Sequence, residues 1–221
     1  MGSLLVRDLS IVINSEIILK TINLNLCEGK IYALLGSNGS GKTMFLKTLA
    51  GIRASDPKKI LFNDQDLAAM DPLARSRMIS MLLQHSPIEP FTSALDRILH
   101  GLIPEYGFFK TCSKEALDKA HEIADRLNIR HLLARPLGCL SGGEQRLIYL
   151  AKCLVNTNIE FLFLDEPTVY LDHEQKKRLG EFLKILTQSG KLIIFSGHDQ
   201  GFTKEFSNGL LEIKDRTIRL I

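Results

Sequence analysis

The segment that most constrains the fold of this 221-residue chain is a glycine-rich run between an apolar stretch and a stretch with a helical pattern. Ile31–Leu35 is unbroken and apolar, as a buried strand would be, and Met44–Leu49 is typical of the start of a helix. The run between them fits G-x-x-x-x-G-K-[ST] and consists of Gly36, Ser37, Asn38, Gly39, Ser40, Gly41, Lys42 and Thr43. Small residues at a helix start expose backbone N–H groups and the positive end of the helix dipole, which bind phosphate oxygens. The sequence therefore predicts a phosphate-binding loop (P-loop) in an α/β fold.

The same loop predicts which side chains meet a nucleotide. Lys42 can reach the β- and γ-phosphates, and the Thr43 hydroxyl can bind Mg²⁺. The alternative is a glycine-rich turn without a ligand, but every position of the pattern and both flanking elements fit. We therefore expect a nucleotide and Mg²⁺ at this loop.

A buried strand that ends in two acids is the second informative feature. The apolar run Phe161–Leu164 is followed directly by Asp165 and Glu166. At the carboxyl end of a central strand, Asp165 would support Mg²⁺ beside the phosphate-binding loop. Glu166 would then face a water molecule in line with the γ-phosphate. Alone, the two acids could simply end a strand at an exposed turn, but the loop earlier in the chain favours the catalytic interpretation.

A third feature indicates that two chains share one nucleotide. Within Leu140–Gln145, residues Ser141, Gly142 and Gly143 lie just before a predicted helix. Exposed N–H groups, a hydroxyl and a helix dipole make this a second possible phosphate site, although the pattern is also an ordinary helix N-cap. One nucleotide does not need two such loops from one chain. We therefore expect this loop to close over the nucleotide that a second copy holds.

These motifs, in this order, resemble those of ABC-type ATPases, the nucleotide-binding subunits of ABC transporters, over nearly the whole chain. Leu140–Gln145 resembles the family's signature motif. The resemblance implies that Gln84 helps to hold Mg²⁺ and senses the transmembrane partner. It also implies that His198 contacts the γ-phosphate and orients the catalytic carboxylate, and that Val169–Asp172 crosses to the other subunit. Taken singly, Gln84 could be a solvated amide at a strand end and His198 a cap of a helix.

One position departs from the family pattern. Where the family usually has an aromatic residue that stacks on adenine, this chain has Ile13, which can cover the base only by apolar contact. The other roles that the resemblance implies are catalysis by Lys42, Glu166 and His198, and Mg²⁺ binding by Thr43, Gln84 and Asp165.

The resemblance and the sequence pattern together predict one nucleotide-binding domain, residues 1–221, with two parts. Residues 1–85 and 159–221 are expected to form an α/β P-loop NTPase core, with a mostly parallel sheet and an N-terminal antiparallel β patch. Residues 86–158 are expected to form an inserted helical subdomain, because apolar residues recur there at three- and four-residue spacing. The β patch is predicted to contain four short strands, Leu4–Val6, Ile11–Ile13, Ile17–Leu19 and Ile22–Leu26.

Composition limits the classes of function. The net charge of +3, with scattered Lys and Arg, gives no argument for nucleic acid. No stretch approaches the ~20 apolar residues that span a bilayer, and the N-terminus lacks a signal-peptide pattern. The four cysteines form no C-x-x-C pair, which argues against a zinc site. We expect a cytoplasmic protein that is peripheral on the inner face of the cell membrane.

The resemblance implies an ATP-hydrolysing subunit that powers a separate transmembrane permease and forms an ATP-sandwich homodimer. The alternative is a non-transport ABC ATPase that acts on nucleic acid or ribosomes, but the long coiled coil or second cassette of such members is not present. Thr168–Asp172 and the segment Phe91–Pro104 resemble those of subunits that import iron chelates and vitamin B12. An iron chelate is therefore the expected cargo, and a heme, lipid or drug exporter stays open.

Overall fold

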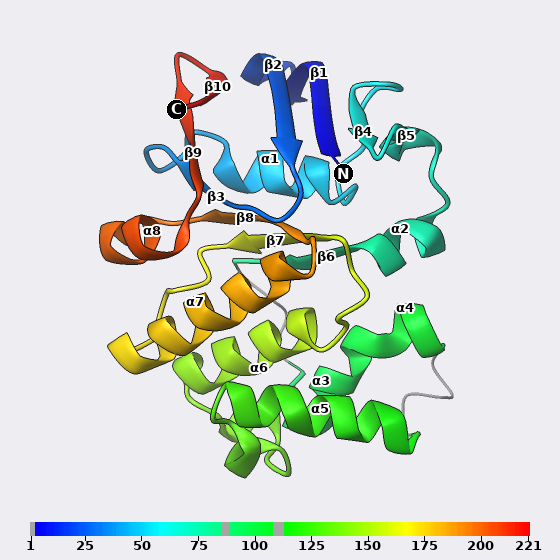
Figure 1. Cartoon of the computed structure of the whole chain (residues 1–221), viewed down its shortest axis with the longest axis vertical. Coiled ribbons are helices and arrows are strands. Elements are labelled where there is room, and N and C mark those ends of the chain that lie inside the picture. Colours follow the sequence, from blue (N-terminus) through cyan, green and yellow to red (C-terminus); the bar gives the residue numbers. More distant parts are fainter. Residues whose placement is uncertain (1–2, 85–88, 108–112) are drawn as a thin grey trace.

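The structure, a computed structural model, describes residues 3–84, 89–107 and 113–221. Three layers follow one another along the long axis of the molecule (Figure 1). An antiparallel sheet lies at one end, a larger sheet crosses the middle, and most of the helices fill the other end. Within the described residues, every helix is too short or too polar to cross a membrane.

The antiparallel sheet has the strand order β2-β1-β4-β5. Its strands are β1 (Ser3–Ile13), β2 (Glu16–Cys27), β4 (Ile60–Phe62) and β5 (Gln65–Asp66). The prediction of four short strands was wrong, because β1 and β2 each run through two of them and pair as one long hairpin. Asp8 and Thr21 have positive φ angles of 44° and 51°, and the register shifts along this pair. Such bulges interrupt the apolar alternation of a sequence without ending the strand.

The larger sheet has the strand order β10-β9-β3-β8-β7-β6. Every neighbouring pair from β9 to β6 is parallel, and β10 runs antiparallel to β9. The strands are β3 (Ile31–Leu35), β6 (Ile79–Leu82), β7 (Phe161–Asp165), β8 (Leu192–Ser196), β9 (Gly209–Lys214) and β10 (Thr217–Leu220). The predicted fold class, an α/β core with a mostly parallel sheet and an antiparallel patch, is confirmed.

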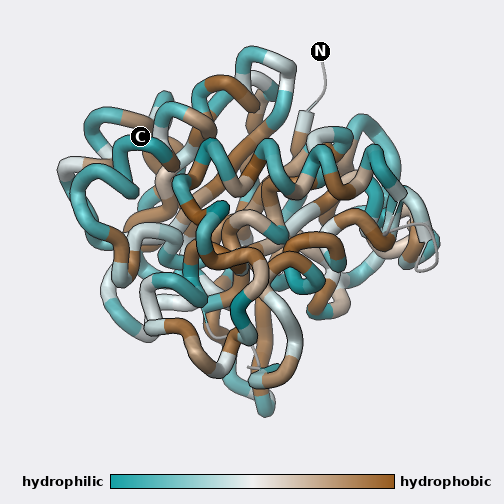
Figure 2. The backbone as a smooth tube through the Cα atoms, turned by 90° about the horizontal axis from the view of Figure 1, so that it is seen from below, coloured by the Kyte–Doolittle hydropathy of each residue, from teal (hydrophilic) through white to brown (hydrophobic). Residues whose placement is uncertain are grey.

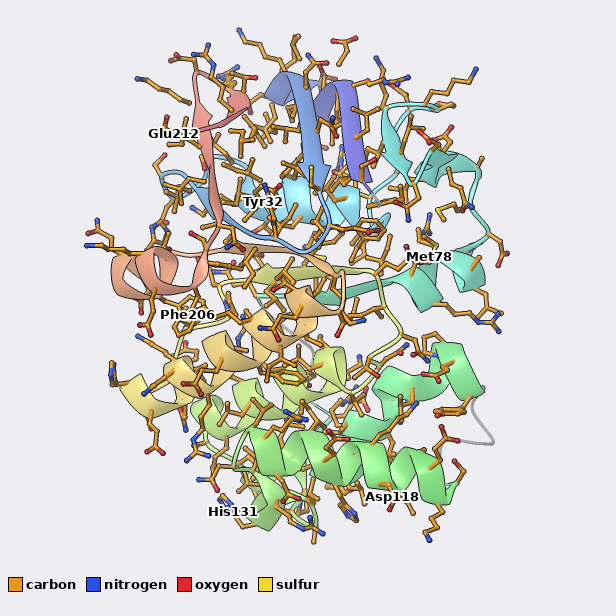
Figure 3. The ribbon with its side chains drawn as sticks, viewed as in Figure 1. Tyr32, Met78, Asp118, His131, Phe206 and Glu212 are labelled. Atoms are coloured by element: carbon orange, nitrogen blue, oxygen red, sulfur yellow. The ribbon has the colours of Figure 1, made fainter. Side chains whose placement is uncertain are left out.

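The strands of the larger sheet bury side chains on both faces, as their unbroken apolar sequences predict. In β7, Phe161 and Phe163 pack into one apolar cluster with the antiparallel sheet and α1 (Lys42–Leu49). Leu162 and Leu164 pack into a second cluster with the helices on the other face. Tyr32 of β3 belongs to the first cluster, and its hydroxyl accepts a hydrogen bond from the Cys27 N–H at 3.1 Å (Figure 3).

The helices of the second cluster lie on the face away from the antiparallel sheet, with apolar segments running through the interior (Figure 2). They are α3 (Ala94–Leu99), α5 (Lys114–Arg126), α6 (Gly142–Leu154), α7 (His173–Gln188) and α8 (Gln200–Phe206). The short helices α2 (Pro72–Met78) and α4 (Ile103–Tyr106) lie at the edge. A single cluster contains residues of the sheet and of α3, α5, α6, α7 and α8. The division into a core and a subdomain of residues 86–158 stays a prediction.

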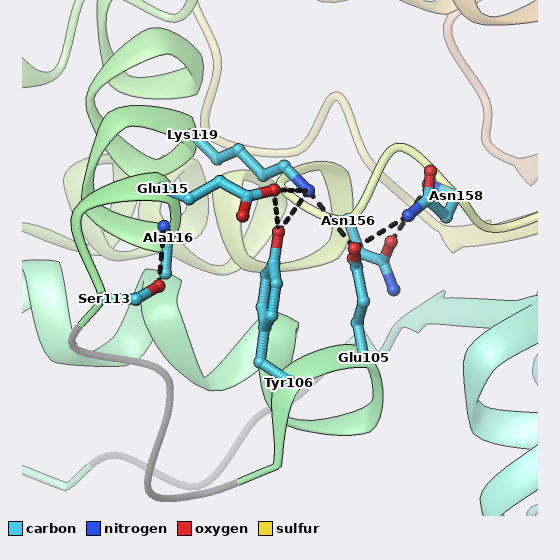
Figure 4. Close-up of polar contacts among 8 residues, drawn as sticks. All are labelled: Glu105, Tyr106, Ser113, Glu115, Ala116, Lys119, Asn156 and Asn158. Atoms are coloured by element: carbon cyan, nitrogen blue, oxygen red, sulfur yellow. Dashed lines mark hydrogen bonds and ion pairs between the residues drawn. The ribbon is translucent and has the colours of Figure 1, made fainter.

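A polar cluster fastens α4 to α5 in the helical layer (Figure 4). The Tyr106 hydroxyl donates to Glu115 at 2.6 Å and accepts from Lys119 Nζ at 2.7 Å. Lys119 also pairs with Glu105 at 3.3 Å, and Asn158 Nδ2 donates to the same carboxylate at 2.8 Å. The hydrogen bond to Glu115 raises the pKa of the Tyr106 phenol. These contacts join α4, α5 and the segment that follows α6.

We expect Phe161→Ala to lower the free energy of unfolding by about 3–5 kcal/mol, because it removes a buried ring from the core. The Phe161 ring is 0% exposed and lies 4.3 Å from the Phe62 ring, centroid to centroid. Phe91 is 95% exposed, so Phe91→Ala is a matched control with an expected change within about 0.5 kcal/mol. Urea unfolding without nucleotide measures both, and equal losses would contradict the expected packing role of Phe161.

Candidate functional site

The carboxyl ends of four adjacent strands meet at one edge of the larger sheet. There β3 leads into the glycine-rich loop, β8 leads to His198, β7 ends at Asp165, and β6 leads to Gln84. Open parallel sheets bind their ligands at this edge. Strand order alone therefore brings together candidate residues that are far apart in the sequence.

A cavity of about 520 Å³ lies at this edge, within the size range of cofactor sites. Ile13, which is predicted to cover the base, lines it together with Ile18 from the other strand of the β1–β2 hairpin, which the sequence analysis missed. The remaining lining residues are Asn38, Gly39, Ser40, Gly41, Lys42, Thr43, Met44, Gln84, Glu166 and His198. One hollow thus combines an apolar wall with the predicted phosphate-binding and catalytic side chains.

The glycine-rich loop leaves the N-terminus of α1 open to the cavity. Gly41 is the N-cap at a φ of 103° and offers no side-chain cap, whereas α2, α3, α5, α6, α7 and α8 each begin with a Ser or Asp cap. A Cβ on Gly36 would lie 2.6 Å from Ser40 Oγ, which is itself buried without a hydrogen-bond partner in the described structure. Uncapped N–H groups and an unpartnered hydroxyl suit phosphate oxygens.

Lys42 lies across this loop and is only 6% exposed. Its Nζ donates to the carbonyl oxygens of Gly36 at 2.7 Å and Ser37 at 3.0 Å, and lies 3.4 Å from His198 Nε2. Burial lowers the pKa of the Lys42 ammonium, and the nearby charges of Glu166 and Asp165 oppose this shift. The ammonium is therefore held beside the loop by two carbonyls and is close enough to two acids to be influenced by their charges.

Oxygen-bearing side chains gather beside Lys42. Thr43 Oγ1 donates to Asp165 Oδ2 at 2.7 Å, and Gln84 Nε2 donates to Glu166 Oε2 at 3.1 Å. Hydroxyl, carboxylate and amide oxygens suit Mg²⁺, whose remaining ligands are commonly substrate phosphates and water. No group of three or more His, Cys, Asp or Glu within the described ranges could hold a metal by itself. The donor set therefore fits a cation that arrives with a phosphate ligand.

Two residues that the sequence analysis missed hold the backbone next to these acids. Ser196 ends β8, and its hydroxyl donates to Asp165 Oδ1 at 2.6 Å. Arg146 of α6 donates to the backbone carbonyls of both Asp165 and Glu166. The sequence does carry a signal for each of them. Ser196 is a polar residue directly after the apolar run Leu192–Phe195, and Arg146 is a charged residue in a largely apolar helix.

The predicted second phosphate loop does not line the cavity of the same chain. Ser141 is the N-cap of α6, and its hydroxyl donates to the Glu144 carboxylate at 2.7 Å while accepting the Glu144 N–H at 3.3 Å. Hydrogen bonds from the Ser141 backbone and side chain lower the pKa of the Glu144 carboxyl. Within one chain, Ser141 therefore acts as a helix cap, and Gly142 and Gly143 begin the helix.

The segment Phe91–Pro104, which resembles that of iron-chelate and vitamin B12 importers, is described, whereas residues 85–88 and 108–112 on either side of it fall outside the described ranges. Ile98 and Leu102 are fully buried in the helical layer, while the Phe91 ring is almost fully exposed. Of the three, only Phe91 could contact a partner without rearrangement of the core.

Asp199 fixes the start of α8 directly after His198. Its carboxylate accepts the Phe202 N–H at 2.9 Å and pairs with Lys176 Nζ at 2.7 Å. The hydrogen bond from Lys176 is the main cause that lowers the pKa of the Asp199 carboxyl. A carboxylate whose folded pKa is lowered stabilises the fold above its unfolded pKa, and this contribution disappears as pH falls through the folded pKa.

We therefore expect Asp199→Asn to lower the free energy of unfolding by about 1 kcal/mol at pH 7, because the ion pair is lost. The difference from the wild type should shrink as pH falls below about 4, where the carboxyl of the unfolded chain is protonated while that of the folded protein stays ionised to lower pH. Chemical denaturation across this pH range measures it, with Asp118→Asn on the exposed face of α5 as the control (Figure 3). A difference that stays constant with pH would contradict the electrostatic explanation.

Comparison with known proteins gives a consistent family. Residues 19–169 match the family model described as "ABC transporter". An arginine/ornithine transport ATP-binding protein of Pseudomonas aeruginosa is 31% identical over 96% of this chain and 87% of its own length. A molybdate/tungstate import ATP-binding protein of Pyrococcus horikoshii is 36% identical over 76% of this chain. The match covers 47% of that relative, about half of its length. A sulfate/thiosulfate import ATP-binding protein of Pseudomonas putida is 30% identical over 99% of this chain and 66% of its own length.

Solved structures give the same architecture. A nucleotide-free ATP-binding cassette from an ABC transporter superimposes with a TM-score of 0.84 at 20% identity, covering 99% of this chain and 90% of that one. An inward-facing structure of a putative metal-chelate type ABC transporter has a TM-score of 0.81 at 26% identity, with coverages of 100% and 83%.

Proposed function

Because this chain belongs to the ABC transporter family of ATP-binding proteins, we propose that it hydrolyses Mg·ATP to drive import through a separate membrane-embedded permease. The single observation that carries this proposal is the cavity at the edge of the larger sheet, where the phosphate loop meets the side chains of three other strand ends. Phosphoryl transfer mainly needs positioning and charge stabilisation, and this constellation can supply both.

In the proposed mechanism, the position of each side chain in the cavity determines its role. Lys42 and the open N-terminus of α1 bind the β- and γ-phosphates, and Ile13 covers the base with Ile18. Glu166 accepts a proton from the attacking water, and His198, close to Lys42 Nζ, contacts the γ-phosphate. These roles are proposals that the short distances within one cavity support.

Mg²⁺ would be held by Thr43, Gln84 and Asp165, whose side chains end in oxygen-bearing groups at adjacent strand ends. The hydrogen bond between Thr43 Oγ1 and Asp165 Oδ2 supports this, because it joins two oxygens that suit the cation. The cation, when bound, would neutralise charge that develops on the phosphate oxygens.

A second copy of the chain would complete the site. Ser141, Gly142 and Gly143 lie outside the cavity of their own chain, and although Ser141 caps α6, Ser141 and Gly142 are exposed at the helix N-terminus, where a phosphate would be favoured. In a head-to-tail homodimer, this loop of one copy would cap the nucleotide of the other. ATP would then favour the closed dimer because it contacts both copies, and hydrolysis would remove that preference.

We propose the direction of transport, import, and no specific cargo. The curated relatives named above carry arginine and ornithine, sulfate and thiosulfate, or molybdate and tungstate, according to their names. They do not support the iron chelate expected from Thr168–Asp172, although the solved structure at 26% identity is described as a putative metal-chelate type. We propose that the chain is an ATPase subunit bound peripherally to the cytoplasmic side of its permease, because the relatives named above are described as transport or import ATP-binding proteins.

Affinity purification of the full chain from membranes of its source tests this function. We expect an integral membrane protein to co-purify and to stimulate ATP hydrolysis. Phe91→Ala is a useful probe, because the ring is exposed and its removal should weaken the association without loss of stability. Stimulation of hydrolysis by DNA or ribosomes, with no membrane partner, would instead favour the non-transport alternative, which no feature of the described structure supports.

A further inference from the structure

The backbone of Glu166 has an unusual conformation for its residue type. Its φ angle is 50°, in the left-handed region that favours glycine. A non-glycine residue persists in this region only when its surroundings impose it, and such residues concentrate at functional sites. The residue that we propose as the catalytic carboxylate therefore needs groups that hold its backbone in place.

Ser196 holds one side of this residue. The Glu166 N–H donates to Ser196 Oγ at 3.1 Å, and the same hydroxyl donates to Asp165 Oδ1 at 2.6 Å. Ser196 is fully buried at the end of β8, so water cannot replace it. A single hydroxyl thus fixes both the amide of Glu166 and the carboxylate that precedes it.

Arg146 holds the other side. Its guanidinium donates to the Glu166 carbonyl at 2.8 Å and also to the Asp165 carbonyl. It further donates to the carbonyls of Leu83 at 2.7 Å and Gln84 at 3.3 Å, at the end of β6. The residue is only 7% exposed. A planar, always charged fork with five donors can bridge two strand ends in this way, whereas a lysine offers three donors on one compact ammonium.

We propose that Arg146 and Ser196 are positioning residues that hold the left-handed backbone of Glu166 and thereby direct its carboxylate at the reacting water. The inference rests on the proposed function, because it assumes that Glu166 is the catalytic carboxylate. Arg146 extends the effect to Gln84, whose side chain contacts Glu166 from the neighbouring strand end. It lies in the first turns of α6, the helix that Ser141 caps, so the proposed partner-facing loop and the catalytic acid share one rigid support.

ATP turnover and ATP affinity of the full-length chain, measured separately, test this inference. For Ser196→Ala we expect kcat to fall about tenfold, because one buried hydrogen bond to the carboxylate's backbone is lost. The Kd for ATP should stay within about twofold, since positioning residues act on the transition state. Ser196→Thr restores the hydroxyl and should recover most of the activity.

For Arg146→Met we expect a larger loss of kcat, about 100-fold, with partial recovery in Arg146→Lys, because lysine can satisfy some of the carbonyls. Arg97 is the matched control. It is a buried arginine of α3, 6% exposed, that pairs with Glu89 at 2.5 Å and makes no contact with Glu166. Arg97→Met should lower stability but leave the kcat of the folded protein unchanged. If Arg146→Met does not fold, Ser196→Ala decides.

A double variant separates positioning from general stabilisation. In a Glu166→Gln background, Ser196→Ala should cause no further loss of single-turnover rate, because its effect passes through the missing carboxylate. An additional tenfold loss there, or wild-type kcat in both Ser196→Ala and Arg146→Met, would overturn the inference. Wild-type turnover in Glu166→Gln alone would instead show that another residue is the general base, and a wild-type chain that hydrolyses no ATP would overturn the proposed function, so these failures are distinguishable.

Discussion

Glu166→Gln is expected to bind ATP with wild-type affinity and to hydrolyse it about 10²–10⁴-fold more slowly, because a general base of this kind contributes that much to catalysis. The amide keeps the size of the carboxylate but cannot accept a proton from water. The geometry of binding is retained, since the phosphate loop and Lys42 make no hydrogen bond to the Glu166 side chain in the structure. Substrate should therefore accumulate on the enzyme.

The same variant should form a stable dimer with ATP, because hydrolysis no longer ends the state in which two copies contact the nucleotide. Gel filtration with and without Mg·ATP, alongside a steady-state ATPase assay, measures both effects. Glu181→Gln on the exposed face of α7 is the control and should resemble the wild type. Normal turnover in Glu166→Gln would assign the general base to another residue.

Lys42→Ala is expected to raise the Kd for ATP roughly 10–100-fold, the effect of losing one hydrogen bond to a charged group. The reason lies in its position: Nζ is held at the loop by the carbonyls of Gly36 and Ser37. Its pKa is lowered by burial, so the binding of phosphate, which supplies opposite charge, should relieve an unfavourable burial of the ammonium.

Isothermal titration with a non-hydrolysable ATP analogue measures this effect. Lys47→Ala, one turn further along α1, is the matched control, because its side chain does not line the cavity. If Lys42→Ala binds the analogue as tightly as the wild type, the ammonium does not contact the phosphates.

The sequence predicted two of the strands whose ends form the site. Ile31–Leu35 matches β3 at both ends, and β7 extends Phe161–Leu164 by one residue. Buried parallel strands are continuous apolar runs, so their signal is local. The β1–β2 hairpin was misread because its bulges at Asp8 and Thr21 break the alternation, while the strand pairing that continues across them is not local.

The residues of the candidate site likewise fall into those that a local sequence pattern predicts and those that it does not. The phosphate loop, Asp165 and Glu166 follow patterns within a few residues, and the structure places them together as expected. Ile18, Arg146 and Ser196 act across long separations in the chain, and no short motif contains them. Ser141 is a third case, because its short pattern is compatible with both a phosphate site and a helix cap. The structure of a single chain shows the helix cap.

The larger sheet belongs to two apolar clusters at once, because alternate residues of each strand point to opposite faces. Neither outer layer can therefore come apart without exposing one face of the same strands. The protein should unfold in one cooperative transition, with no populated species in which the helical layer alone has melted. Hydrogen exchange in the central strands would then report global opening, and nucleotide bound at their ends would slow it across both layers alike.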